Sequence, residues 1–521
     1  MATKKTAAKK PAANKTVSQQ PVATQPAVDA PSSTNPTPVA PAQRVSVRMY
    51  RQGLGDCFLI TFPNASGKSF HMLIDCGVVL GTPDSKTRMA AVVRDIASAT
   101  GNQIDLLVAT HEHWDHVSGF IQAQDLFDKL TIQQLWVAWT EDPTDALANK
   151  LRAERRTAEK ALRMAVNHLA MAGDTDTAQR VSSLVGFFGA ASGSTDDALN
   201  YVKKRAPGGK PRYCQPGEAP IVLEELPDVR VWVLGPPKDE KLIKKSNPGK
   251  NEGYGLDAGP GGSQALLVAG LVRNMGAADG LLLDDSIEDP FDPMYTIPMA
   301  RAEHVPFFEK RYYGDSTDGG IYEKSAGKEI HDQAWRRIDS AWMDASETMA
   351  LQLDSATNNT SLVLAIELET GAILLFPGDA QAGNWLSWQG LKWEIGDPGN
   401  KKTVTGPELL ARTIFYKVGH HGSHNATLQA KGLELMVNDS LVAMIPVDHA
   451  MALKKRWGRM PFPALVDRIR DKTHGRVLSA DDDVTAPADL AKLKPDNVDL
   501  GDWKEFADRV QVTELYYEIS F

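Results

Sequence analysis

Residues 110–119 have the sequence THEHWDHVSG, which places four residues that commonly bind metals within six positions. The preceding segment, 104–109, is apolar and partly β-branched, and this composition predicts a buried strand. Because His111 and His113 are two positions apart, an extended backbone would direct both imidazoles to the same side. The pattern therefore predicts a metal site at the end of this strand.

Asp115 and His116 are adjacent, so they cannot repeat the geometry of alternating residues. We expect them to turn toward a second metal position beside the first. Mixed nitrogen and carboxylate ligands favour Zn²⁺, followed by Mn²⁺ or Fe. The alternative, a polar loop with exposed histidines, is disfavoured because three of the twelve histidines fall within these six residues.

The bulk composition excludes several classes of protein. The chain of 521 residues is long enough for several domains or for one enlarged domain with insertions. Its net charge of −9 gives no general attraction for nucleic acid or an anionic membrane, although a local basic groove is still compatible with it. No run of 18 apolar residues, no secretory signal and no CxxC pair is present, so we expect a cytoplasmic protein without a membrane span or disulfide framework.

The chain divides into a tail and a long remainder. Residues 1–43 contain almost no large apolar side chains, so they cannot bury enough surface to offset the entropy lost on ordering. We expect a disordered tail, which serves as a solubilising tether or as an arm that binds nucleic acid or a partner weakly. The sequence pattern of residues 44–521 predicts one domain with two insertions. We expect the insertion at 140–219 to be helical and the one at 238–345 to be irregular.

Short strands dominate the rest of the sequence. Strands covered by helices on the outside predict two sheets packed face to face. The expected strands are 45–50, 57–62, 70–75, 104–109, 135–139, 221–223, 229–234, 361–368, 372–376, 412–418, 441–447 and 510–519. Besides the helical insertion, the expected helices are 83–100, 331–353, 381–390, 427–436 and 462–472, and the one at 331–353 closes the irregular insertion.

Two later segments, each after an expected strand, carry further polar residues. Asp379 follows Gly378 at the end of a strand, a position suited to a carboxylate that bridges two cations. Residues 419–424 have the sequence GHHGSH. We expect His420 to complete the second metal shell and His421 to act in catalysis or to contact anionic oxygens of a substrate. The alternative is again a loop with exposed histidines.

The ordered series His-x-His-x-Asp-His, Gly-Asp and His-His-Gly-Ser resembles the metallo-β-lactamase superfamily. Within it, four segments resemble the lactamase-like domain of ComEC-type DNA-uptake proteins, namely 52–57, 73–77, 358–362 and 420–423. The resemblance extends over about 44–120, 220–236 and 355–480. It implies an αββα four-layer sandwich with a dinuclear site at one edge of the sheets.

The resemblance also implies a set of site residues. The implied ligands are His111 and His113 at metal one, Asp115, His116 and His420 at metal two, and Asp379 between the metals. Most relatives carry a further histidine on metal one, whereas this chain has Asn-Asn-Thr-Ser at 358–361, so metal one is expected to be more open. Asp115 and His421 are the expected catalytic residues, and Asn359, Ser423 and His424 the expected substrate contacts.

These observations lead to three hypotheses about function. The first is a dinuclear-metal-dependent hydrolase of a phosphoester, above all a phosphodiester such as nucleic acid or a nucleotide, in which a hydroxide that bridges the metals attacks phosphorus. The second is a hydrolase of a thioester, lactone or lactam. The third is a metal-stabilised, non-catalytic module that binds a protein through the tail or an insertion. The sequence favours no particular oligomeric state.

Overall fold

The structure is a computed structural model, and it describes residues 44–521 apart from 64–67, 172–174, 191–192, 250–251, most of 254–344, 398, 456 and 458–459. The chain divides into two units, Met1–Gln43 and Arg44–Phe521, and the second carries the fold. The expected disordered tail and most of the expected irregular insertion lie outside the described residues. In the described part of the insertion, short elements occur at α7 (Glu240–Ile243), α9 (Met299–Ala302), α10 (Pro306–Phe308), β13 (Tyr322–Ser325) and β14 (Lys328–His331).

The first sheet has eight strands in the order β10-β7-β5-β3-β2-β1-β23-β22. Strands β1 to β3 form an antiparallel meander, whereas β3, β5, β7 and β10 run parallel. Their carboxyl ends therefore meet at one edge, which is where residues 75 and 110–116 leave the sheet. The bounds are β1 Ser46–Tyr50, β2 Phe58–Phe62, β3 Phe70–Ile74, β5 Leu106–Ala109, β7 Leu135–Ala138, β10 Arg212–Cys214, β22 Val510–Val512 and β23 Tyr516–Ser520.

The second sheet has seven strands in the order β11-β12-β15-β16-β19-β20-β21. Strands β16, β19, β20 and β21 run parallel, so the loops after β16 and β19 also lie at one edge. These loops carry Asp379 and the 419–424 segment. The bounds are β11 Ile221–Leu223, β12 Leu226–Gly235, β15 Val363–Glu367, β16 Ile373–Phe376, β19 Thr413–Lys417, β20 Val442–Ile445 and β21 Val477–Ser479.

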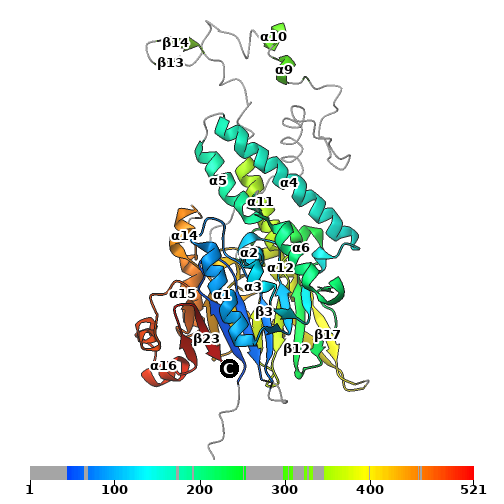
Figure 1. The fold of residues 1–521 in the computed structure, drawn as a ribbon, viewed down its shortest axis with the longest axis vertical. Coiled ribbons are helices and arrows are strands. Elements are labelled where there is room, and N and C mark those ends of the chain that lie inside the picture. Colours follow the sequence, from blue (N-terminus) through cyan, green and yellow to red (C-terminus); the bar gives the residue numbers. More distant parts are fainter. Residues whose placement is uncertain are drawn as a thin grey trace, which may run out of the picture. The chain divides into compact units, whose positions relative to one another are not determined.

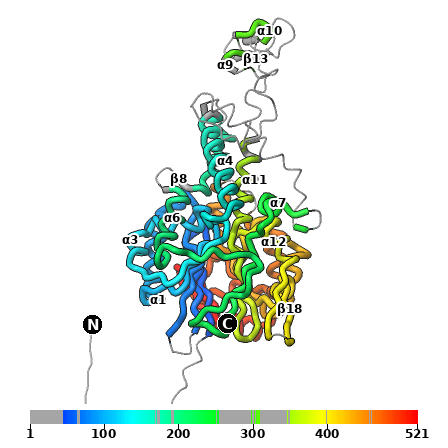
Figure 2. The backbone as a smooth tube through the Cα atoms, turned by 90° about the vertical axis from the view of Figure 1, so that its right-hand side faces the viewer, coloured from blue at the N-terminus to red at the C-terminus, as the bar shows by residue number. Residues whose placement is uncertain are grey.

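The two sheets pack face to face, and helices cover both outer faces (Figures 1 and 2). Inner side chains of both sheets share one apolar core, in which the rings of Phe58 and Phe376 lie 5.8 Å apart. A second cluster packs α1 (Ser85–Thr100) and α2 (Trp114–Gln122) on the first sheet, and a third packs α12 (Ala382–Ser387) and α15 (Pro463–Lys472) on the second. The expected αββα sandwich is confirmed.

Three helices form a separate layer beside the sandwich. They are α4 (Ala146–Met171), α5 (Thr175–Val185) and α11 (Ala345–Asn358), and their apolar side chains share one cluster. Figure 1 shows the three helices side by side. Two of them fall within the expected helical insertion, but the same stretch also contains β10, which pairs with the first sheet, and α6 (Thr195–Arg205), which packs on it.

Some expected elements differ from the structure. Residues 427–436 form turns and a short 3₁₀ helix rather than an α-helix, because Gly432 has φ −143° and ψ −104°, outside the helical region. The expected strand 510–519 is two antiparallel strands, because the Thr513 hydroxyl accepts hydrogen bonds from the backbone N–H groups of Leu515 and Tyr516 and turns the chain. The helix expected at 331–353 begins only at Ala345 in the described part.

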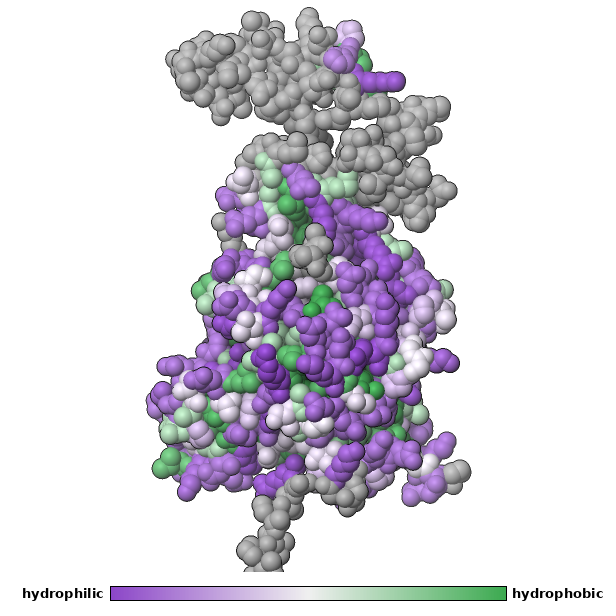
Figure 3. Space-filling model, viewed as in Figure 1, coloured by the Kyte–Doolittle hydropathy of each residue, from purple (hydrophilic) through white to green (hydrophobic). Residues whose placement is uncertain are grey.

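The surface is consistent with a core buried between the layers. On the face drawn in Figure 3, the described residues are mostly hydrophilic, and hydrophobic residues are scattered among them. In the described part of the chain, none of the helices combines the length and the hydropathy needed to span a bilayer.

Candidate metal centre

The loop after β5 positions the first group of polar side chains. Both oxygens of Asp75 fix Thr110, which donates its backbone N–H (2.8 Å) and its hydroxyl (2.6 Å) to them. The helix α2 then begins at Trp114, so Asp115 lies in its first turn. Gly77 allows this turn to approach closely, because a Cβ there would lie 2.3 Å from the carbonyl carbon of Asp115.

Four buried side chains from three distant segments form one cluster. They are Asp115 and His116 of α2, Asp379 after β16 and His421 after β19, and their ligand atoms all lie within 4.8 Å of one another. His421 Nε2 lies 2.8 Å from Asp115 Oδ2, and His116 Nε2 lies 3.0 Å from Asp379 Oδ2. Two imidazoles and two carboxylates at these separations are a set of ligands that suits a divalent metal ion such as those of the first transition row or zinc.

His111 and His113 form a pair next to this cluster. His111 Nε2 lies 3.1 Å from His113 Nδ1, and the His111 ring centroid lies 4.2 Å from that of His116. Two nitrogens bonded to one tetrahedral cation at about 2.0–2.1 Å lie roughly 3.3 Å apart. The pair therefore has the spacing of two ligands of one cation.

The opposite ring nitrogens of three of these histidines are held by oxygen atoms. The contacts are His111 Nδ1 to Thr110 Oγ1 (3.2 Å), His116 Nδ1 to Asp75 Oδ2 (2.8 Å) and His421 Nδ1 to Pro446 O (2.6 Å). Histidines that bind metals usually carry such a contact on the other nitrogen, because it fixes the tautomer and the ring orientation. Each ring is thereby held with its other nitrogen toward the cluster.

Several buried atoms around the cluster have no hydrogen bond of acceptable geometry. They are His113 Nε2, Asp115 Oδ1, His116 Nε2, Asp354 Oδ1 and Asp379 Oδ2. Unpaired buried polar atoms are costly and rare in folded proteins. Divalent cations would satisfy Asp115 Oδ1, His116 Nε2 and Asp379 Oδ2, so the residues present fit a metal centre, whereas His113 Nε2 and Asp354 Oδ1 face each other at 3.8 Å.

The carboxylates around His116 also favour a bound cation. Burial lowers the pKa of His116, but the carboxylates of Asp379, Asp56, Asp115 and Asp75 raise it and hold it well above its ordinary value. The cluster thus favours a positive charge at this point, which a cation supplies directly. In contrast, burial together with neighbouring imidazoles holds the pKa of His111 well below its ordinary value, and neutral imidazole is the form that binds metals.

Lys417, the last residue of β19, is a charged contact of the cluster that sequence reasoning missed. Its ammonium group is buried and donates to Asp379 Oδ1 (2.9 Å), to Gly378 O (2.7 Å) and to Asp56. Burial raises the pKa of Asp379, but the positive charges of Lys417 and His116 lower it by more. The pKa of Asp379 therefore lies well below its ordinary value. The only signal in the sequence is a lysine that ends an otherwise apolar strand.

The two adjacent histidines after β19 point to different places. The structure brings His421, and not the expected His420, into the cluster with Asp115 and Asp379. The His420 backbone N–H donates to Asp379 Oδ1 (2.9 Å), while its ring lies 2.9 Å from Ser423 Oγ and lines a cavity. Both histidines have positive φ angles, 44° and 52°, which separates their side chains.

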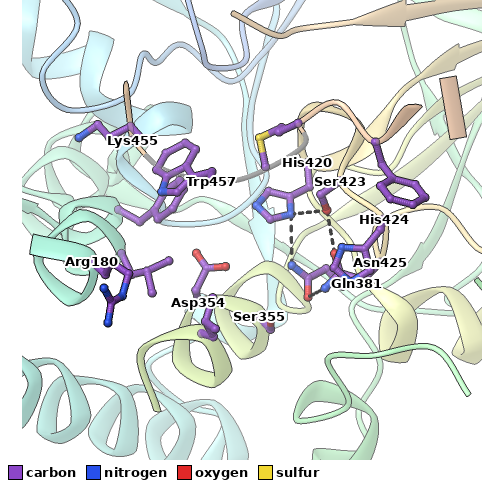
Figure 4. Close-up of a pocket in the computed structure, with 15 residues that line it drawn as sticks. Arg180, Asp354, Ser355, Gln381, His420, Ser423, His424, Asn425, Lys455 and Trp457 are labelled. Atoms are coloured by element: carbon purple, nitrogen blue, oxygen red, sulfur yellow. Dashed lines mark hydrogen bonds between the residues drawn. The ribbon is translucent and has the colours of Figure 1, made fainter. Parts of the chain in front are cut away.

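The cavity beside the cluster has a volume of about 430 Å³ (Figure 4). Ser423 and His424, both expected as substrate contacts, line it. Asn359, the third expected contact, is not among the residues that line it. The Asn359 amide instead donates to the carbonyls of Ile243 (3.1 Å) and Lys245 (2.8 Å), a structural role.

Asp354 of α11 is a second residue that the sequence did not reveal. It lines the cavity, is buried, and its Oδ1 lies 3.8 Å from His113 Nε2, while Asn358 Nδ2 donates to its Oδ2 (3.2 Å). Burial and the charges of Asp115 and Asp379 raise its pKa well above the ordinary value. The spacing of four between Asp354 and Asn358 puts both on one helix face, but the sequence offers no sign that this face meets the metal residues.

Glu112, between the two paired histidines, faces away from the cluster. Its carboxylate makes a buried, two-pronged contact with the guanidinium group of Arg155 in α4. This contact ties the loop that carries the histidines to the helical layer.

Comparison with known proteins supports a metal centre. Residues 50–132 match the family model of the metallo-beta-lactamase superfamily. A search of curated proteins and a search of solved structures each found no match. The matched domain and the buried cluster of histidines and aspartates suggest a metal-dependent hydrolase.

Proposed function

We propose that the chain is a dinuclear-metal-dependent hydrolase of phosphoesters, with phosphodiesters such as nucleic acid or nucleotides as the first candidates. The observation that carries the proposal is the buried cluster of Asp115, His116, Asp379 and His421, which lies beside the pair His111 and His113. A cavity of about 430 Å³ lies beside this centre. Its lining includes Asp354, whose Oδ1 lies 3.8 Å from His113 Nε2, and His420, whose backbone N–H donates to Asp379, so we place substrate binding there.

We assign the ligands as follows: His111 and His113 at one metal, Asp115, His116 and His421 at the other, and Asp379 between them. This assignment replaces His420 by His421, in line with the 2.8 Å contact between His421 and Asp115. Two divalent cations bound there would supply a Lewis acid and an activated water. The nitrogen and carboxylate donors favour Zn²⁺, with Mn²⁺ or Fe next.

Residues around the centre would position its parts. Lys417 keeps Asp379 ionised and therefore able to bind a cation. His420 and Ser423 line the cavity in which a substrate would bind, and their orientation is fixed, because the His420 ring contacts Ser423 Oγ (2.9 Å) and the Ser423 hydroxyl donates to Asn425 Oδ1 (2.7 Å).

The charge of the cavity supports a phosphoester over a neutral ester or thioester. Its wall includes Lys455 and Arg180 as well as the two imidazoles of His420 and His424. Cations and hydrogen-bond donors of this kind bind phosphate oxygens well. Hydrolysis of a thioester, lactone or lactam remains the second candidate, because the same metal centre can polarise a carbonyl group.

The test is a substrate panel on one preparation of the protein. With added Zn²⁺ or Mn²⁺, we expect hydrolysis of bis-p-nitrophenyl phosphate and little turnover of nitrocefin or acyl thioesters. Chelation of the metal should abolish the activity. Turnover of thioesters or nitrocefin without any phosphodiesterase activity would overturn the proposal in favour of the second candidate.

A binding module without activity is the third candidate, and two variants separate it. Asp379→Ala and His113→Ala should abolish turnover while the far-ultraviolet circular dichroism stays close to that of the unaltered protein. If the unaltered protein turns over no substrate of the panel, and a partner binds both variants as well as it binds the unaltered protein, the module explanation replaces ours.

A further inference from the structure

The cavity beside the candidate metal centre has two unlike walls (Figure 4). Arg180, Lys455 and Trp457 lie on the left of this view, whereas His420, Ser423, His424 and Asn425 lie on the right. The carboxyl group of Asp354 projects between the two walls. Positive charge therefore lies on the wall across the cavity from His420.

Lys455 carries a positive charge on this wall. Among the described residues, no carboxylate lies within ion-pair distance of its ammonium group, although the side chain is half-buried. Burial, with a smaller contribution from Lys454, lowers the pKa of Lys455. The buried cations Lys417 and Arg155, in contrast, both contact carboxylates. A partly buried charge without a partner is costly, so its position on a cavity wall points to a ligand.

Trp457 is a rigid part of the same wall. Its indole Nε1 is buried and has no hydrogen-bond partner among the described residues. The ring is fixed, because it stacks on Phe187 with centroids 4.6 Å apart and planes at 17°. Trp457 therefore gives this side of the cavity a rigid surface, while its indole N–H is closed off from the cavity.

We propose that the substrate of the metal centre carries a second anionic group, such as a second phosphate, which binds to Lys455 while the scissile group lies at the metals. Arg180 lies on the same wall and adds positive charge. This inference rests on the proposed function, and it defines the substrate as a phosphoester with two separated anionic groups.

The volume of the cavity sets the size of such a substrate. About 430 Å³ lies within the range of roughly 300–1,000 Å³ that is usual for pockets that bind small molecules. The recognised part of the substrate is therefore a compact molecule or the end of a chain.

A matched pair of substrates tests the inference. Thymidine 5′-(p-nitrophenyl phosphate) and the same ester with a 3′-phosphate release the same chromophore and differ only in the second anionic group. We expect kcat/KM to be about tenfold higher for the bisphosphorylated ester, the size of effect that one charge-assisted hydrogen bond produces. Lys455→Ala should abolish this preference, mainly through KM.

Lys454→Ala is the matched control. Lys454 is the preceding residue, it is exposed, and its replacement removes the same charge from the same region of the surface. We expect this variant to retain the preference for the bisphosphorylated ester. If Lys455→Ala lowers kcat/KM for both esters by the same factor, or if Lys454→Ala abolishes the preference equally, then Lys455 has no specific role and the inference is overturned.

A binding measurement separates this inference from the proposed function. Calorimetry on the metal-loaded protein would compare thymidine 3′,5′-bisphosphate with thymidine 5′-monophosphate. If the bisphosphate binds more tightly and this difference depends on Lys455, the second-anion site is supported, whether or not the esters are hydrolysed. A lack of hydrolysis would then count against the proposed function alone. Equal affinities would overturn the inference even if bis-p-nitrophenyl phosphate is hydrolysed.

Discussion

His420 and His421 are neighbours in the chain with different surroundings. His421 contacts Asp115 at 2.8 Å inside the cluster, whereas His420 contacts Ser423 at 2.9 Å on the cavity wall. The sequence could predict that this loop contributes a histidine to the site. It could not predict which one, because the choice depends on the left-handed backbone angles of both residues and on the position of α2 in the other half of the fold.

Alanine substitutions at these two positions should have different effects on metal content. After dialysis, we expect His421→Ala to lose about one of two metal equivalents, because it removes a ligand from the second metal. His420→Ala should retain both and lose activity only. Elemental analysis measures the content, and His424→Ala, which removes another histidine of the cavity wall, is the control that should keep both. Loss of metal from His420→Ala with full content in His421→Ala would contradict the assignment.

Lys417 should matter for stability as well as for the charge of the site. Replacing it by Met leaves Asp56 and Asp379 buried without their cation, and removing one partner of a buried ion pair costs about 3–5 kcal/mol. We therefore expect the free energy of unfolding of Lys417→Met to be about 3–5 kcal/mol lower than that of the unaltered protein, measured by denaturant unfolding in the presence of a chelator. Lys431→Met breaks only an exposed ion pair with Glu252 (3.0 Å) and should cost less than about 1 kcal/mol. Equal effects of the two changes would argue against the buried contact.

At the scale of elements, the loops after parallel strands carry the site, and this much followed from the sequence. Apolar segments such as 104–109 and 372–376 became β5 and β16, and the polar residues after them reached the same edge. The contribution of the helical layer did not follow. Asp354 and Arg155 reach the site through packing between helices distant in the sequence, which no local pattern encodes.

The contact between Arg155 and Glu112 makes a prediction about pH. Burial raises the pKa of Glu112 to about 7, although Arg155 lowers it. A raised carboxyl pKa means that the folded state holds the proton more tightly than the unfolded state, so this group favours folding below its unfolded pKa, and that benefit is lost as pH rises through about 7. Arg155→Met raises the pKa further, so the loss of Tm relative to the unaltered protein should be larger at pH 8 than at pH 5.5.

Thermal unfolding of the metal-free protein at both pH values measures this effect. Arg156→Met is the control, because Arg156 is exposed and only pairs with Asp196 at 3.2 Å on the surface. The control should lose little stability at either pH. A loss for Arg155→Met that is the same at pH 5.5 and pH 8 would show that Glu112 does not carry the proton.

At the scale of the whole molecule, the sandwich brings together residues that are far apart in the chain. Residues 111–116 leave the first sheet, and residues 379 and 421 leave the second, at edges that meet. The resemblance to the superfamily predicted this arrangement, and the structure confirms the sandwich. The cavity could not be predicted, because its walls combine the 420–425 loop with helices and a segment after α14 (His449–Lys454).

The metal content of the purified protein tests the central claim most directly. After dialysis against metal-free buffer, elemental analysis should find about two equivalents of a divalent metal, zinc first, and markedly less in Asp379→Ala, which removes the carboxylate between the sites. A folded protein that retains no stoichiometric metal, and binds none when Zn²⁺ or Mn²⁺ is added, would contradict the account.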